Sequence, residues 1–293
     1  MTFRRADARS IAGLMRLLVI TILALIAFAA NSVLNRSALA LEEIGPGLFQ
    51  AIRMTSGAAM LIMLVAVRER GIGSIMRHGH LPSAAMLLLY MIGFSYAYLS
   101  LETGIGALLL FGGVQVTMFA GAILSGERPS VARLAGAGLG LGGLAVLFWP
   151  GVAAPSPVGA ALMSVAAVGW GVYSLFGRRP GPPLSKTAAN FILALPVAIL
   201  IAVLFPDAQG TSGRGIALAV ASGALASGVG YALWYSVLPR LDATLAAVAQ
   251  LTVPIIALSG GIVFLGEPLT FRFLVAAVLI MGGVLLALDL RRR

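Results

Sequence analysis

Ser125-Gly126-Glu127-Arg128 is the stretch that decides the fold, because its pattern returns near the end of the chain as Leu265-Gly266-Glu267-Pro268. Each stretch follows one apolar run and opens another, and the second runs contain Gly142-Gly143-Leu144 and Gly282-Gly283-Val284. A shift of 140 residues places the first turn on the second and the first glycine pair on the second. Agreement over a whole helix-turn-helix, at about half the chain length, predicts a duplicated unit.

The composition places the chain in a membrane. Hydrophobic residues make up 60% of its 293 residues and charged residues only 10%, whereas a soluble protein carries about 25% charged residues. The absence of cysteine excludes disulfides and thiolate metal sites. The net charge of +10 comes from basic residues spread through short loops, which indicates membrane topology rather than a nucleic-acid surface. We therefore expect an all-α integral membrane protein.

Ten apolar runs of about 20 residues are long enough to cross a bilayer as helices. The longest apolar stretch, 134–177, must be two helices because Pro150 and Pro157 interrupt it. This break separates a first five-helix repeat, 1–150, from a second one, 157–293. The predicted spans are 15–35, 47–67, 82–101, 104–125, 131–149, 157–177, 186–205, 214–238, 242–264 and 270–289.

The first span resembles a secretory signal peptide, since arginines precede an apolar run that ends in Ala27-Phe28-Ala29. The duplication argues against cleavage. A shift of 142 residues lays Phe28 on Trp170 and Asn31 on Tyr173, deep in the second repeat. We therefore predict that the first span is a structural helix.

The distribution of Lys and Arg predicts which side each loop faces. With the N-terminus in the cytoplasm, sixteen of the twenty lie in cytoplasmic segments, Arg36, Arg214 and Arg272 lie on the other side, and Arg53 lies within a span. This bias predicts a multi-pass protein of the cell (inner) membrane with both termini in the cytoplasm. Since each repeat has five spans, the second enters the bilayer from the opposite side. Such inverted repeats are common in secondary transporters, whose solute site lies near the midplane between them.

These features resemble the ten-helix branch of the drug/metabolite transporter superfamily, the EamA-like exporters. The resemblance is carried by the two Gly-Glu turns, the two Gly-Gly helices and Gly169-Trp170-Gly171 in the sixth span. Within the family the chain looks like the YddG-type exporters of aromatic amino acids. The resemblance covers nearly the whole chain, and it implies export of small organic solutes through a central cavity between the repeats.

Polar and aromatic residues near the predicted midplane form the candidate substrate-binding site. An unpaired amide is costly in hydrocarbon, so the amides among them should face the interior. Aromatic walls suit an apolar or aromatic solute whose polar end is held by a few amides. For any single residue, packing between helices is the alternative role. The candidates are Asn31, Tyr90, Ser95, Tyr98, Gln115, Trp170, Tyr173, Tyr231, Trp234 and Gln250.

Arg53 joins this candidate site because it is the only ionisable residue well inside a predicted span. The carboxylate of a solute would be a suitable partner for it. It lies about 10 Å from the outer end of its helix, at 1.5 Å per residue, so snorkelling to the interface is the alternative. No Asp or Glu lies in the middle third of any span, so we do not expect a carboxylate proton relay.

The repeated turns and glycines predict structural roles. Glu127 and Glu267 each lie where a carboxylate can cap the N-terminus of the following helix and interact with its dipole. The glycines from Gly136 to Gly143 form small-residue ladders that let helices approach closely. We expect that close contact within one chain, and therefore a monomer.

Enzymatic function is not expected. The only histidines, His78 and His80, lie in a basic loop, and the spans offer no Asp pair, metal cluster or nucleotide-binding motif. We expect no catalysis, no cofactor and no nucleic-acid partner. The sequence predicts a secondary transporter in the lipid bilayer that exports amino acids by alternating access, and aromatic or apolar amino acids are the leading candidates. A broad drug or purine-type metabolite exporter and a non-transporting channel or scramblase are the alternatives.

Overall fold

The computed structural model describes residues 3–69, 72–73, 75–124, 126, 130–149, 154–177, 180–207, 210–237, 240, 249–250 and 252–287. All regular structure within these ranges is helical, and none of it is strand. The prediction of an all-α protein is confirmed for this part of the chain.

The helices follow the predicted spans, and the first is longer than expected because it begins at Phe3. Their bounds are α1 Phe3–Leu39, α2 Pro46–Glu69, the short helix η1 Ile75–His78, α3 Leu81–Ala97, α4 Thr103–Leu124, α5 Val131–Phe148, α6 Pro157–Gly177, α7 Pro183–Leu204, α8 Gly213–Val220, η2 Ala221–Val229, α9 Gly230–Val237, α11 Val253–Leu265 and α12 Phe271–Ala287.

Six helical segments of the described chain are long and apolar enough to cross a membrane, and four shorter helices are also apolar. The chain is therefore a multi-pass integral membrane protein. The predicted break is confirmed, since α5 ends at Phe148 and α6 begins at Pro157, a residue that suits the first position of a helix. The ninth predicted span, 242–264, lies partly outside the described residues, and α11 covers its second half.

The eighth predicted span is helical over its described residues, 214–237, but its middle is not an α-helix. α8, η2 and α9 continue one another from Gly213 to Val237, and η2 is π-helical. π-Helical turns are rare and are frequently found at functional sites. A Cβ added to Gly223 in η2 would lie 2.1 Å from the carbonyl oxygen of Arg53, so the backbones of η2 and α2 touch at a position that only glycine fits.

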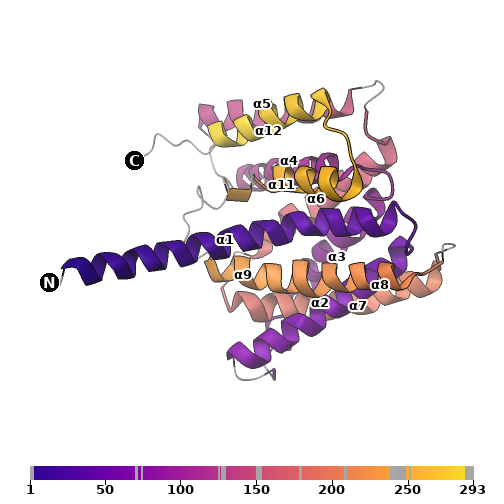
Figure 1. Ribbon diagram of the computed structural model, residues 1–293, viewed down its shortest axis with the longest axis horizontal. Helices are drawn as coiled ribbons and strands as arrows, with labels where there is room; N and C mark the ends of the chain where they lie inside the picture. The colour runs from indigo at the N-terminus through magenta and orange to yellow at the C-terminus, as the bar shows by residue number, and fades with distance from the viewer. Residues whose placement is uncertain are drawn as a thin grey trace.

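The helices run side by side along one axis, and α1 begins at the end of the bundle where α12 ends (Figure 1). When the two predicted repeats are aligned, α1 matches α6, α3 matches α8 and α9, and α4 matches α11. Equivalent pairs of helices make contact. α3 packs on α6, and its equivalent pair, α8 and α9 with α1, also packs together; α4 packs on α6, and its equivalent, α11, packs on α1. The matched helices α2 and α7, α4 and α11, and α5 and α12 contact each other directly.

Glycines at matching positions allow α5 and α12 to touch. A Cβ on Gly143 would lie 3.0 Å from the carbonyl oxygen of Ala276, and one on Gly283 would lie 2.5 Å from that of Gly136. A shift of 140 residues converts the first contact into the second. The expected close approach of helices within one chain is therefore present.

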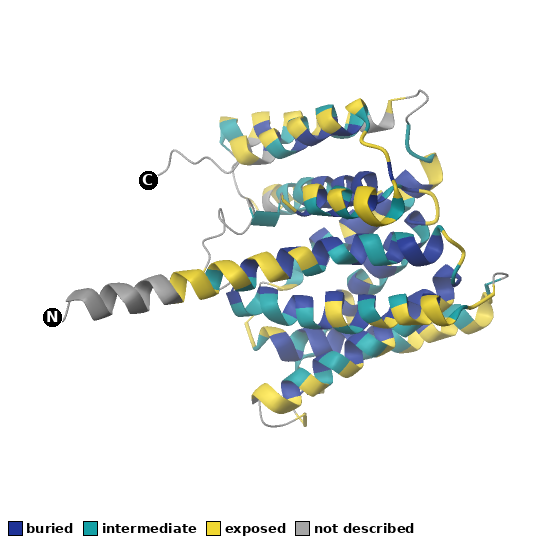
Figure 2. Ribbon diagram, viewed as in Figure 1, coloured by how far each residue is buried: buried dark blue, intermediate teal, exposed yellow. Residues whose placement is uncertain are grey.

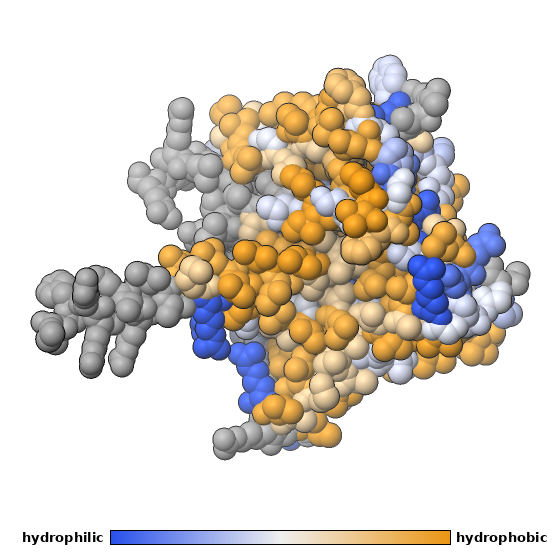
Figure 3. Space-filling model, in the orientation of Figure 1, coloured by the Kyte–Doolittle hydropathy of each residue, from blue (hydrophilic) through white to orange (hydrophobic). Residues whose placement is uncertain are grey.

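The outer surface is apolar and part of the interior is polar. Large apolar side chains such as Ile22, Leu200 and Val278 are exposed, whereas Asn31 and Asn35 are buried. Buried residues concentrate where the central helices meet (Figure 2), and apolar side chains cover most of the visible face while polar ones gather toward its two ends (Figure 3). This distribution suits a protein whose solvent is lipid.

Candidate functional site

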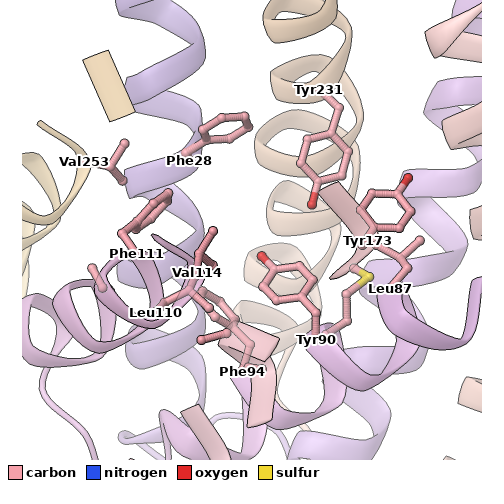
Figure 4. Packing of buried hydrophobic residues seen from close by; sticks show 14 of the residues in the cluster. Phe28, Leu87, Tyr90, Phe94, Leu110, Phe111, Val114, Tyr173, Tyr231 and Val253 are labelled. Carbon is pink, nitrogen blue, oxygen red and sulfur yellow. The ribbon is translucent and has the colours of Figure 1, made fainter. Parts of the chain in front are cut away.

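Aromatic side chains from α3, α6 and α9 meet at the centre of the bundle. The ring of Trp170 lies 4.9 Å from that of Tyr90 and 5.3 Å from that of Tyr231, and it stacks on Tyr231 with 24° between the planes. Tyr173, on the next turn of α6, lies 5.6 Å from Trp170. These four predicted site residues therefore form one contiguous aromatic cluster, of which Figure 4 shows the three tyrosines.

Phe28 of α1, which is absent from the predicted site, extends the cluster to a fourth helix. Its ring meets those of Tyr231 and Trp234 edge-on, at 5.9 and 5.7 Å. The central cavity among these side chains has a volume of only about 10 Å³, roughly the room that one water molecule needs. A solute could enter it only if the surrounding helices moved apart.

Buried polar side chains connect α1 to η2 and α3 beside the aromatic cluster. The Ser222 hydroxyl donates to Asn31 Oδ1 at 2.7 Å, and Asn31 Nδ2 donates to Ser227 Oγ at 3.3 Å. Asn35 Nδ2 donates to Ser222 Oγ at 3.3 Å, and Asn35 Oδ1 accepts from the Ser95 hydroxyl at 2.9 Å. Asn31 and Ser95 thus face the interior, as the cost of burying unpaired polar groups requires.

Arg53 lies within this polar network and does not reach the membrane surface. Its side chain is fully buried, and Nη2 donates to Tyr90 Oη at 3.3 Å and to Ser227 Oγ at 3.4 Å. The guanidinium carbon lies 5.1 Å from the centre of the Phe94 ring, so the aromatic face also stabilises the charge. The snorkelling alternative is wrong, because these hydroxyls and rings hold the side chain inside.

Seven of the eleven predicted residues do not line the central cavity, and three of these seven, Tyr98, Gln115 and Gln250, also lie outside the aromatic cluster and the polar network described above. Tyr98 is buried at the end of α3, where its hydroxyl donates to the carbonyl oxygen of Thr103 at 3.3 Å. Gln115 on α4 and Gln250 are half-buried. Their part in the solute site stays a prediction.

Glu267 caps a helix, but not the one expected. Its two carboxylate oxygens accept from the backbone N–H of Thr103, the first residue of α4, at 2.9 and 2.8 Å. The carboxylate therefore stabilises the N-terminus of α4 rather than that of α12. The reason is Gly266, whose left-handed conformation (φ 66°) reverses the chain at the end of α11, which packs on α4. Arg36 of α1 completes the contact, with Nε 3.4 Å from Glu267 Oε1.

Other carboxylates lie at the same end of the bundle as Glu267, where α2 and α4 begin. Asp207, after α7, accepts from the backbone N–H of Leu48 in the first turn of α2 at 3.0 Å. Burial raises the pKa of Glu102, and the nearby Glu267 carboxylate raises it further. Residues of the second predicted repeat therefore cap helices of the first. Glu127, the repeat counterpart of Glu267, lies outside the described residues.

Gln50 also belongs to the network, since its Oε1 accepts from the Ser95 hydroxyl at 3.0 Å. Four buried polar residues of the network are absent from the sequence prediction: Asn35, Gln50, Ser222 and Ser227. Asn35 could have been found, because it lies four residues after Asn31 and hence on the same face of α1. Ser222 and Ser227 are five residues apart, a spacing that favours a common face only in a π-helix. Isolated serines in an apolar span usually signal no more than helix packing.

A larger cavity, of about 200 Å³, lies at the opposite end of the bundle, near η1. His78, Lys186 and Asn190 line this basic vestibule. Tyr173 lines it too, and the same side chain belongs to the aromatic cluster. One tyrosine therefore lies between the vestibule and the centre of the bundle.

Comparison with known proteins identifies the family. Residues 157–288 match the EamA-like transporter family. A protein of Pseudomonas aeruginosa is 46% identical over 273 residues, which are 93% of this chain and 94% of that protein. The aromatic amino acid exporter YddG of Ancylobacter novellus is 29% identical over 285 residues, 92% of this chain and 98% of that one. One solved crystal structure has a similar fold, with a TM-score of 0.65 and 24% identity over 92% of this chain and 97% of its own.

The family and the relative from Ancylobacter novellus both carry the names of transporters and not of enzymes. The matching turns, the helical membrane fold and these similarities agree, and the chain belongs to the EamA-like transporter family of the drug/metabolite transporter superfamily.

Proposed function

We propose that this protein exports small organic solutes from the cytoplasm by alternating access, and that its preferred substrates are aromatic and apolar amino acids. The observation that carries the proposal is the buried aromatic cluster around Trp170, which lies beside the buried guanidinium of Arg53. Aromatic walls next to a cation suit a solute with an apolar ring and a carboxylate. The similarity to an aromatic amino acid exporter supports the same class of solute.

The proposal includes two inverted five-helix repeats, 1–150 and 157–293, that enclose the solute site. The reciprocal helix contacts support this arrangement, because helices related by a two-fold axis contact each other at equivalent positions. The matching contacts of Gly143 and Gly283 support it further. The aromatic cluster then lies between the repeats, with α1 and α3 from the first and α6 and α9 from the second.

The orientation assigns a direction to the two ends of the bundle. With both termini in the cytoplasm of an inner-membrane protein, the vestibule beside Lys186 faces the cytoplasm and the contact between Arg36 and Glu267 faces outward. A solute enters the vestibule, passes Tyr173 and reaches the cluster. Separation of the outward contacts then releases it, which is the sequence of events that alternating access requires.

Counterflow in proteoliposomes tests this function. We expect unlabelled L-phenylalanine inside the vesicles to stimulate saturable uptake of radiolabelled L-phenylalanine. Trp170→Ala should lower that uptake about tenfold, because it removes the stacking surface shared by three tyrosines. Trp149→Ala is the matched control, since this tryptophan is 71% exposed beyond the end of α5.

The same assay separates the alternative functions. Counterflow of adenine, without counterflow of any amino acid, would contradict the proposed solute class and favour a purine-type exporter. Solute flux without stimulation from the opposite side would contradict a carrier and indicate a channel.

A further inference from the structure

Two tyrosines from different helices line the central cavity. Tyr90 comes from α3 and Tyr231 from α9, both side chains are buried, and both line the cavity. In Figure 4 the Tyr231 hydroxyl points down toward Tyr90 and the Tyr90 hydroxyl points up from the other side of the gap between the two rings, whereas the hydroxyl of Tyr173 points away. The polar groups that a solute would meet at this point are therefore two phenol hydroxyls contributed by different helices.

Both hydroxyls have a proton to donate. The Tyr231 hydroxyl is buried and has no hydrogen-bond partner among the described residues. The Tyr90 hydroxyl accepts from Arg53 Nη2 at 3.3 Å, so its own proton is directed away from the arginine. A buried donor without an acceptor is costly, and the site is therefore incomplete as it stands.

The group beside Tyr90 is the positively charged guanidinium of Arg53, which has no counter-ion among the residues that the structure describes. Arg53 is fully buried, and none of the described carboxylates forms an ion pair with it. Its Nη1 has no hydrogen-bond partner in the described part of the protein. Hydroxyls and aromatic faces stabilise a guanidinium only partly, so an anion close by would be strongly favoured.

We propose that Tyr90 and Tyr231 clamp the carboxylate of the solute between their hydroxyls, with Arg53 as the positioning residue behind Tyr90. Arg53 orients the Tyr90 hydroxyl and supplies the positive field, while Trp170, stacked on Tyr231, takes the apolar body of the solute. The inference rests on the proposed export function and narrows its substrate class to carboxylates with an aromatic or apolar body. Neutral amides, amines and purines lack the group that the clamp holds.

Competition against L-phenylalanine counterflow tests the clamp. The four competitors each carry a phenyl ring and differ in their polar groups. They are L-phenylalanine, phenylacetate, L-phenylalaninamide and phenylethylamine. We expect the two carboxylates to compete at least about tenfold better than the amide and the amine, because hydrogen bonds to a charged acceptor are the stronger kind. Phenylacetate separates recognition of the carboxylate from recognition of the amino group.

Conservative variants locate the recognition. Tyr90→Phe and Tyr231→Phe each remove one hydroxyl, and each should reduce the preference for phenylalanine over its amide by about tenfold. Tyr96→Phe removes a hydroxyl on α3 away from the central cavity, and should leave the preference unchanged. Arg53→Lys should retain part of the preference and Arg53→Gln should lose it. Comparing two ligands on one protein cancels any difference in the amount of folded transporter.

Two outcomes distinguish this inference from the function on which it rests. If the amide and the amine compete as well as phenylalanine, or if both Tyr→Phe variants keep the full preference, the clamp is refuted and the export function stands. If the wild type shows no counterflow of any amino acid, the proposed substrate class itself fails and the clamp fails with it.

Discussion

At the scale of single residues, one carboxylate joins the ends of four helices. Glu267 follows α11 and binds the first residue of α4, while Arg36 on α1 binds both Glu267 and the backbone oxygens of Tyr98 and Leu99 after α3. Glu267 is only 9% exposed, so water cannot easily replace these bonds if the carboxylate is lost. In the orientation and transport cycle that we propose, these bonds would keep the outward end closed.

Glu267→Gln should therefore destabilise the protein. The amide keeps one acceptor for Thr103 but loses the charge that faces Arg36 and the N-terminus of α4, which should cost about 1–3 kcal/mol. Thermal unfolding in detergent micelles measures the change. Glu43→Gln is the matched control, because its partner Arg214 is 61% exposed and the loss should stay within about 1 kcal/mol. Equal losses in the two variants would show that Glu267 has no special role.

Local sequence predicts the chemistry of Glu267 but not its target. A carboxylate after a helix-ending glycine predicts a cap, and Gly266 does end α11 in the left-handed conformation. The first residue of α4 lies beside this turn because α4 and α11 pack against each other, and no local sequence pattern predicts that packing. The same limit applies to Arg53. Its position within a span marks it as a functional candidate, but the Tyr90 and Ser227 hydroxyls that hold it come from helices distant in sequence.

At the scale of elements, hydropathy locates the helices well. A segment that crosses a bilayer must be long and apolar, and its backbone N–H and C=O groups must form hydrogen bonds with each other. Pro150 and Pro157 also predict correctly where the apolar run from 134 to 177 divides. Hydropathy does not reveal η2, since a π-helix and an α-helix have the same composition. The serines of η2 are therefore the site residues that were hardest to predict.

The glycine pairs in α5 and α12 offer a test at this scale. Gly283→Ala should weaken the packing of the two helices by about 1–3 kcal/mol, because the new Cβ would meet backbone atoms of Gly136 and Gly140. Gly282→Ala is the control one residue away, where a Cβ meets nothing within 4 Å. It should be neutral or stabilise the helix by up to about 1 kcal/mol. Thermal unfolding in detergent measures both, and a destabilising Gly282→Ala with a harmless Gly283→Ala would place the helix contact on the wrong face.

At the scale of the whole molecule, the two ends of the bundle differ in charge. Glu43, Glu102, Asp207 and Glu267 lie at the end where α2 and α4 begin, and all but Glu102 bind groups on other elements. The basic vestibule lies at the end where α2 finishes. This asymmetry agrees with the bias of Lys and Arg in the sequence, and cytoplasmic ends of membrane proteins carry such an excess of positive charge.

The proposed inverted repeat makes one prediction that can be tested directly: the two Gly-Glu turns lie on opposite sides of the membrane. Because the chain has no cysteine, single cysteines can be introduced without background labelling. Ser130→Cys, beside the first turn, should react with a membrane-impermeant maleimide only after the cells are permeabilised. Leu269→Cys, beside the second turn and 54% exposed, should react in intact cells. If both cysteines react from the same side, the repeats cannot be inverted, and a solute site between them loses its structural basis.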